Sequence, residues 1–139
     1  MNVDDLNALV SGAIWRAQQL DDLGLETAGS AWMEVSRFEE ELSKVIPISE
    51  PEGRIARRGA IRAALKANLP ARAKELVACY LAEKCVPKSL RGEFNEILEA
   101  TSQMLAEEFP SAARHHKMSD FQILVAQLLE RGPFCLAAA

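Results

Sequence analysis

Apolar residues recur at helical spacing along almost the whole chain. In residues 4–23 they follow the i, i+3, i+4, i+7 rule of a helix that buries one face. Gly24 comes directly after this run, where many helices end in a left-handed residue. We therefore predict a first helix over residues 4–23 with the apolar face Leu6, Leu9, Val10, Ala13, Ile14, Ala17 and Leu20.

A second helix is predicted over residues 26–46, because apolar residues there are spaced alternately by three and four until Pro47 and Pro51 intervene. The same spacing occurs in coiled coils, but about three heptads are too few for that assignment. Core packing is the favoured interpretation. The apolar set is Ala28, Ala31, Val35, Phe38, Leu42 and Val45, with Trp32 beside them.

The segment IPISEPEG at residues 46–53 is predicted to be a linker, because it places prolines, a serine and a glycine between periodic segments. After it we predict helices over about 54–68, from Pro70 to about 85, and over about 90–109. Ser119 and Gln122 form a capping box for a sixth helix, which Gly132 and Pro133 close. No segment alternates with period two, so no sheet is expected.

These elements predict an all-α fold, a compact bundle of about six helices built from antiparallel hairpins. We expect one helical domain over residues 1–139, with hairpins at 1–46 and 54–86 and a C-terminal helical pair at 88–131. The arrangement is repeat-like, because the triplet GAI at residues 12–14 recurs 47 residues later at 59–61.

Charge is sorted into three blocks along the chain. Residues 1–53 hold 3 basic and 11 acidic side chains, residues 54–91 hold 10 and 2, and residues 92–139 hold 3 and 7. The blocks therefore carry net charges of −8, +8 and −4. This sorting suggests that an anionic group lies against the basic middle, either the chain's own flanks or a partner.

Composition places the chain among globular proteins, since its 139 residues are 49% hydrophobic and 26% charged. No apolar stretch is long enough to cross a bilayer, and the acidic start of the chain is unlike a signal peptide. We therefore expect a cytoplasmic protein, bacterial in type. The 3 cysteines lack CxxC spacing, and His115 and His116 are adjacent, so no metal site and no cofactor are expected.

The third predicted helix carries the strongest functional signal. Its basic residues are spaced by four and form a ladder, with one further arginine alongside. Aliphatic residues lie among this ladder, while alanines and glycine occupy the opposite side. Arginine mixed with aliphatic residues is common at interfaces. We predict a partner-binding face made of Arg54, Arg57, Arg58, Arg62, Lys66, Ile61, Leu65 and Leu69.

Neutralisation of the ladder within the chain is the main alternative. The candidate acids come from the first block and are Asp21, Asp22, Glu39, Glu40 and Glu41. In the partner interpretation, the protein is a small cytoplasmic interaction module or adaptor without catalytic activity. Its partner is then an acidic protein or a second copy of the chain, forming a homodimer.

Two other functions remain as weaker hypotheses. Residues 54–74 could bind an anion or a nucleic-acid backbone, but the net charge of −4 and the lack of interleaved aromatic residues disfavour nucleic acid. A metal-dependent hydrolase would use the carboxylates Glu34, Glu39, Glu40 and Glu41, yet no second acidic motif follows them on the next helix.

Overall fold

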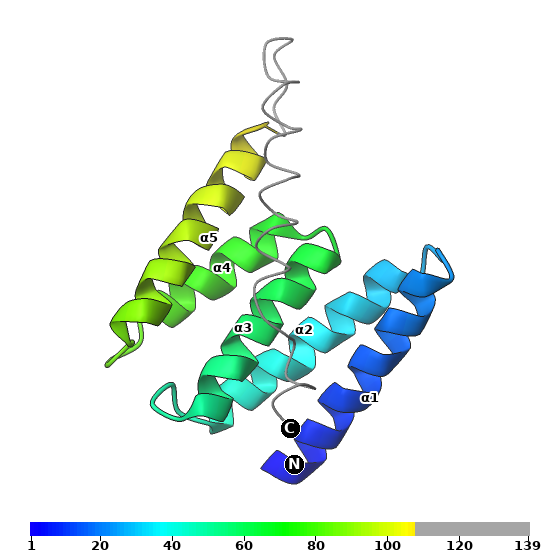
Figure 1. Ribbon diagram of the computed structural model, residues 1–139, viewed down its shortest axis with the longest axis horizontal. Helices are drawn as coiled ribbons and strands as arrows, with labels where there is room; N and C mark the ends of the chain where they lie inside the picture. Colours follow the sequence, from blue (N-terminus) through cyan, green and yellow to red (C-terminus); the bar gives the residue numbers. More distant parts are fainter. Residues whose placement is uncertain (108–139) are drawn as a thin grey trace.

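Residues 1–107 are described by the structure, a computed structural model, and within them the chain is helical without any strand (Figure 1). The helices are α1 Val3–Asp22, α2 Ala28–Val45, α3 Pro51–Lys66, α4 Pro70–Leu81 and α5 Lys88–Glu107. The all-α fold class is confirmed for this range. The helix expected from Ser119 onward lies outside the described residues, so the count of about six stays a prediction.

Helices α1 and α3 end in the same hydrogen-bonded motif. Gly24 after α1 has a φ of 67°, and Asn68 after α3 has a φ of 60°. The N–H of Leu25 donates to the carbonyl of Leu20 (3.0 Å), and the N–H of Gly24 donates to that of Asp21 (2.9 Å). This pair of bonds is a Schellman cap, which the left-handed residue makes possible, and the sequence prediction of a helix end at Gly24 is confirmed.

Two helix boundaries differ from the sequence prediction by more than two residues. The sequence predicts that α3 begins at about residue 54, but it begins at Pro51. Proline is well suited to the first helical position, which explains the earlier start. Gly53 then lies so close to the linker that a Cβ there would overlap the carbonyl of Pro47. α4 ends at Leu81, earlier than the predicted residue 85, and the N–H of Glu83 already turns back to the carbonyl of Tyr80 (3.2 Å).

The helices form a row in which each packs antiparallel against the next, with α1 and α5 at the two ends (Figure 1). Two apolar clusters fill the row. One lies between α1, α2 and α3 and contains Trp32, and the other lies between α3, α4 and α5 and contains Phe94. Within residues 1–107, α1 therefore packs antiparallel on α2, and α3 packs antiparallel on α4.

Helix α3 is the centre of the row and is buried on two sides. Its small residues Ala56 and Ala63 belong to the cluster shared with α1 and α2. Its larger residues Ile61 and Leu65 belong to the cluster shared with α4 and α5. A Cβ on Gly59 would overlap the carboxylate of Glu39 on α2, so the small face of α3 does allow close approach of a neighbouring helix.

Candidate functional site

The residues predicted to form a partner-binding face do not share one exposed surface. Ile61 is 0% exposed and Leu65 is 7% exposed, and both belong to the core. Arg57 and Arg62 are buried as well, at 3% and 6% exposure. The other four are less buried: Arg54, Arg58 and Leu69 are partly exposed, and Lys66 is exposed.

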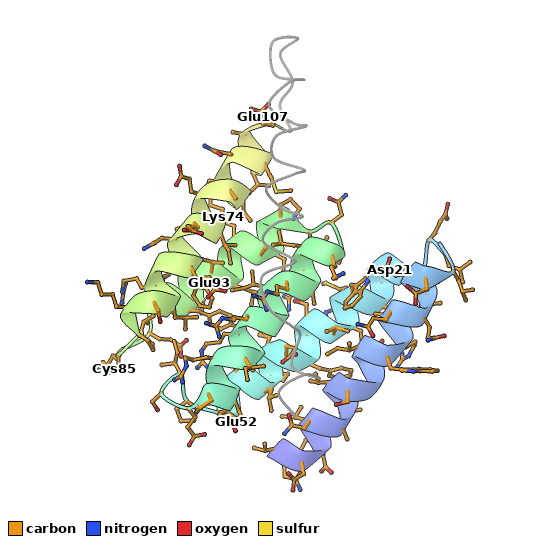
Figure 2. All side chains as sticks on the ribbon, in the orientation of Figure 1. Asp21, Glu52, Lys74, Cys85, Glu93 and Glu107 are labelled. Carbon is orange, nitrogen blue, oxygen red and sulfur yellow. The ribbon has the colours of Figure 1, made fainter. Side chains whose placement is uncertain are left out.

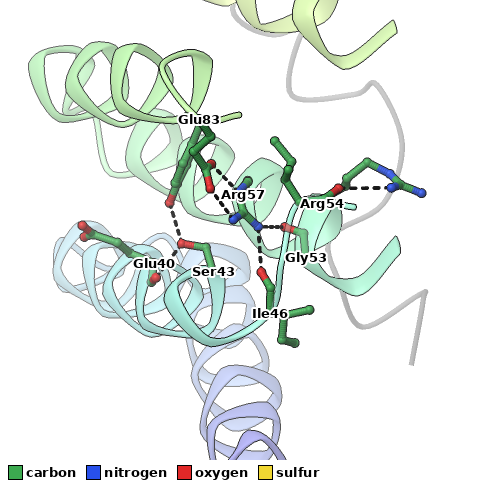
Figure 3. A network of polar contacts seen from close by, with 9 residues as sticks. Glu40, Ser43, Ile46, Gly53, Arg54, Arg57 and Glu83 are labelled. Atoms are coloured by element: carbon green, nitrogen blue, oxygen red, sulfur yellow. Dashed lines mark hydrogen bonds and ion pairs between the residues drawn. The ribbon is translucent and has the colours of Figure 1, made fainter. Parts of the chain in front are cut away.

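Arg57 is held by a network that joins three parts of the chain (Figure 3). Its Nε and Nη2 each donate to one carboxylate oxygen of Glu83, both at 2.7 Å. Its Nη1 donates to the carbonyls of Ile46 (3.0 Å) and Gly53 (2.7 Å). The guanidinium also lies 5.5 Å from the ring centroid of Tyr80, a cation–π distance. Arg57 therefore fastens the α2–α3 linker to the end of α4.

Arg58 and Arg62 both pair with a single acid, Glu93 on α5. Arg58 Nε donates to Glu93 Oε2 at 3.0 Å, and Arg62 Nη2 lies 3.6 Å from Glu93 Oε1. Burial lowers the pKa of Arg62, while the nearby Glu93 carboxylate opposes that effect. Part of the ladder is thus neutralised within the chain, by a residue of the third charge block.

A further arginine, Arg72 on α4, reaches back to α2. Its Nε donates to Ser36 Oγ at 3.0 Å, and its Nη2 donates to Glu40 Oε1 at 2.8 Å. Ser36 Oγ in turn donates to the carbonyl of Ala60 on α3 at 2.7 Å. Of the five acids considered from the sequence, Glu40 makes an ion pair with the basic block, and it does so with Arg72 outside the ladder.

The acceptors Glu83 and Glu93 were missed by sequence reasoning, which looked for acids only in the first block. A charge count by block hides them, because Glu83 stands inside the basic block itself. Asp21 accepts from Trp32 Nε1 at 2.9 Å, and Glu41 pairs with Lys44 at 2.9 Å. Glu39 is fully buried against Gly59. The ion pairs of the α3 arginines are therefore made with residues later in the chain. Arg58 and Arg62 pair with Glu93 on α5, and Arg57 pairs with Glu83 in the turn between α4 and α5.

A cleft of about 690 Å³ lies between α2 and α4. Its lining includes three basic residues, Lys44, Arg57 and Arg72, and three acidic residues, Glu40, Glu75 and Glu83. Ser43 Oγ donates its proton to the Glu40 carbonyl at 2.6 Å. The hydroxyl of Tyr80 is therefore the donor in its 3.1 Å contact with Ser43 Oγ. The charged groups balance and largely pair with each other, so the cleft shows no preference for an anion or a cation.

The described residues do not gather potential metal ligands at any one place. No group of three or more histidines, cysteines, aspartates or glutamates in residues 1–107 is placed to hold a metal ion. The carboxylates of the hydrolase hypothesis point to different neighbours, since Glu34 pairs with Arg16 at 3.1 Å and Glu40 with Arg72. Cys79 and Cys85 are free and exposed, while His115, His116 and Cys135 lie outside the described residues.

The exposed apolar side chains of the described residues gather on α1 and its two ends. Of seven exposed large hydrophobic side chains, six belong to residues 1–25, and Val45 is the exception. Trp15 is 64% exposed, whereas the other tryptophan, Trp32, is 1% exposed. The six are Met1, Val3, Leu9, Trp15, Leu23 and Leu25.

Trp15 lies in the middle of a stripe that faces away from the core. Helical spacing of three and four residues joins the members of this stripe, and every one of them is exposed. We call it the α1 outer stripe, and it consists of Asp4, Ala8, Gly12, Trp15, Gln19 and Asp22. It has an acid at each end and small residues beside a tryptophan in the middle. The helical pattern of α1 already places Trp15 opposite the apolar face, so this feature could have been found from the sequence.

The fold does not explain two members of the α1 outer stripe. A Cβ on Gly12 would meet no atom within 4 Å, so the helix carries a glycine that its own packing does not require. Such a glycine destabilises a helix by about 0.5–1 kcal/mol relative to alanine. Asp22 stands in the last turn of α1, which contains no basic residue, and there a negative charge opposes the helix dipole.

Comparison of the chain with protein-family models, with curated proteins and with solved structures found no match. No helix within residues 1–107 is long and apolar enough to cross a membrane.

Proposed function

We propose that this protein is a small cytoplasmic interaction module or adaptor without catalytic activity, and that it binds a partner helix on the α1 outer stripe. The observation that carries the proposal is the 64% exposure of Trp15 in the middle of that stripe. Exposure of a large aromatic side chain to water is unfavourable, and aromatic residues are enriched where proteins bind each other. Gly12 and Ala8, one and two turns before Trp15, allow a second helix to approach closely.

The charge around Trp15 favours a basic partner. Residues 1–26 contain five acids and one base, Arg16, which is already paired with Glu34. Asp22 makes no ion pair with a described residue, and it opposes the dipole of its own helix. A cationic side chain from a partner would offset both effects. The fitting occupant is thus a helix that presents small or apolar residues with lysine or arginine beside them.

A homodimer built on this stripe alone is less favourable. Antiparallel pairing of two α1 helices seats Trp15 on Gly12 of the second copy, which suits their sizes. The same register sets Asp4 of each copy against Asp22 of the other, and like charges at such contacts repel. Binding of an anion through residues 54–74 also draws less support, because Arg57, Arg58, Arg62 and Arg72 are engaged by glutamates of this chain.

The test is a fluorescence titration with a synthetic helical peptide. The probe is an 18-residue peptide of lysine, alanine and leucine at helical spacing, without tryptophan or tyrosine, and its counterpart carries glutamate in place of lysine. We expect the lysine peptide to shift the emission of Trp15 to shorter wavelength, saturably, and more weakly as NaCl rises from about 50 to about 500 mM. Trp32 is buried and contributes a constant background.

Two glycine variants locate the binding surface. Gly12→Arg adds bulk and positive charge to the α1 outer stripe and should abolish the shift. Gly92→Arg places the same side chain on α5, at another exposed helical glycine with open space around it, and should leave the shift unchanged. The proposal is wrong if the glutamate peptide binds as well as the lysine peptide, or if the two variants behave alike.

A further inference from the structure

Helix α5 exposes a face whose chemistry complements the α1 outer stripe. Lysine and arginine stand at its N-terminal end, followed by a glycine and an asparagine. We call this the α5 outer face, and its residues, all exposed, are Lys88, Arg91, Gly92, Asn95 and Glu99. Neither Lys88 nor Arg91 makes an ion pair with a residue of the described range. A Cβ on Gly92 would meet nothing within 4 Å, as at Gly12.

The two faces also lie at opposite ends of the same row of helices (Figure 1). Asp21 and Cys85, which are labelled near the acidic end of α1 and the basic start of α5, lie on opposite sides of the molecule (Figure 2). Within the row each helix packs antiparallel on its predecessor. A helix added beyond α5 to the row formed by residues 1–107 would run antiparallel to α5, as α1 of another molecule can.

We infer that the α1 outer stripe receives the α5 outer face of a second copy of this chain, so that copies stack head to tail and continue the row. This inference rests on the proposed function, because it names the partner helix of the same stripe. The contact joins two different surfaces, so it is heterologous and does not close after two copies.

One antiparallel register aligns the basic start of α5 with the acidic end of α1. Lys88 and Asn95 are seven residues apart, and so are Trp15 and Asp22, which is about 10 Å along each helix. When Lys88 faces Asp22, Asn95 therefore faces Trp15. The cation at Lys88 then offsets the unfavourable charge of Asp22 at the end of α1.

The contact is expected to be weak. A single pair of helices buries less than the roughly 1,200 Å² of a standard stable interface. Each copy also carries a net charge of −4, which opposes association at long range. We expect association in the range of about 0.1–1 mM, and stacking should become visible only at high protein concentration.

Sedimentation equilibrium of the full chain, from about 20 µM to about 1 mM at physiological ionic strength, tests the inference. The weight-average mass should rise steadily from 15.3 kDa and pass twice that value without a plateau. Trp15→Glu should keep the mass at that of the monomer. Val45→Glu alters an exposed hydrophobic residue outside α1, 51% exposed, and should leave the association unchanged.

Charge reversal provides a rescue. Asp22→Lys and Lys88→Glu should each weaken association several-fold, because each sets like charges against one another. The double variant Asp22→Lys/Lys88→Glu restores an opposite pair in every contact and should recover most of the wild-type association. Circular dichroism checks that all variants keep their helices, which is expected because every altered side chain is exposed.

A monomer at every concentration overturns the inference, as does a mass that levels off at two chains, since that result indicates a closed pair. Failure of the double variant to restore association overturns it as well. If the lysine peptide binds at the α1 outer stripe while the chain stays monomeric, the proposed function stands and the stacking inference fails. If the peptide does not bind and the chain stays monomeric, both fail.

Discussion

Arg57 of α3 and Glu83 beyond the end of α4 face each other in a two-bond arrangement, with both N–H···O distances at 2.7 Å. Arg57 is almost completely buried, whereas the Glu83 side chain is 31% exposed. Two backbone carbonyls, of Ile46 and Gly53, complete the arginine's hydrogen bonds. The pair therefore joins the segment before α3 to the turn after α4. Each of these two segments adjoins a residue of the same apolar cluster, Ile48 in the first case and Tyr80 in the second.

Replacing Arg57 by methionine should lower the free energy of unfolding by about 3 kcal/mol, because buried carbonyl groups and one carboxylate lose their donor. Arg54→Met is the matched control. Arg54 donates to the carbonyls of Ile48 (3.1 Å) and Ser49 (2.9 Å) from a partly exposed position, so its loss should cost about 1 kcal/mol or less. Urea denaturation followed by circular dichroism measures both. Equal losses would show that the Arg57 network adds nothing special to stability.

Helix positions in residues 1–107 could be predicted from the sequence because they depend on local patterns. Apolar spacing placed α1 and α2 to within two residues at each end, and Gly24 and Pro70 marked a cap and a helix start. The start of α3 was placed too late because proline at residue 51 was interpreted as a break. Proline both ends the preceding segment and begins the next helix, and the sequence alone does not separate the two roles.

The pairing of charges could not be predicted in the same way. Glu83 lies 26 residues from Arg57 and Glu93 lies 35 residues from Arg58, and such pairs depend on which helices come together. Helical spacing correctly grouped the ladder residues Arg58 and Arg62, which meet at Glu93. It also placed Ile61 and Leu65 beside them, but an amphipathic pattern does not show that α3 has neighbours on both sides.

Two alanine substitutions at glycine should change stability in opposite directions. Gly59→Ala should destabilise the fold by about 1–3 kcal/mol, because its Cβ would overlap the Glu39 carboxylate between α2 and α3. Gly12→Ala should stabilise it by about 0.5–1 kcal/mol, because alanine is the better helix former and the position is open. Chemical denaturation of both variants checks the signs. A stabilising Gly59→Ala would mean that α2 and α3 pack less closely than described.

Tyr80 should ionise at a higher pH than a free tyrosine, and its ionisation should lower the stability of the fold. Burial raises the pKa of Tyr80 to about 12, against the hydrogen bond with Ser43, which acts in the opposite direction. An unfolded tyrosine titrates near 10, so between about pH 10 and 12 the folded state holds the proton that the unfolded state releases. The stability from this group is therefore complete below about pH 10 and is lost as the pH rises toward 12.

Ultraviolet titration near 295 nm can follow this ionisation, since Tyr80 is the single tyrosine of the chain. We expect a midpoint well above 10 in the native protein, and a midpoint near 10 in denaturant. Tyr80→Phe should remove this part of the alkaline loss of stability. A native midpoint near 10 would indicate that solvent reaches the hydroxyl group and that its contact with Ser43 is open.

The two tryptophans should respond differently to a quencher, and their difference tests whether the α1 outer stripe is open in solution. Trp15 is 64% exposed and Trp32 is 1% exposed, so acrylamide should quench one emission component strongly and the other weakly. Trp15→Phe should remove the accessible component and change the free energy of unfolding by no more than about 0.5 kcal/mol. Trp32→Phe should remove the protected component and cost about 1–3 kcal/mol, because it leaves a gap in the core and takes the indole donor from Asp21. If both components were equally protected, Trp15 would already be covered in the isolated chain, and the stripe could not serve as a free docking surface for a partner helix.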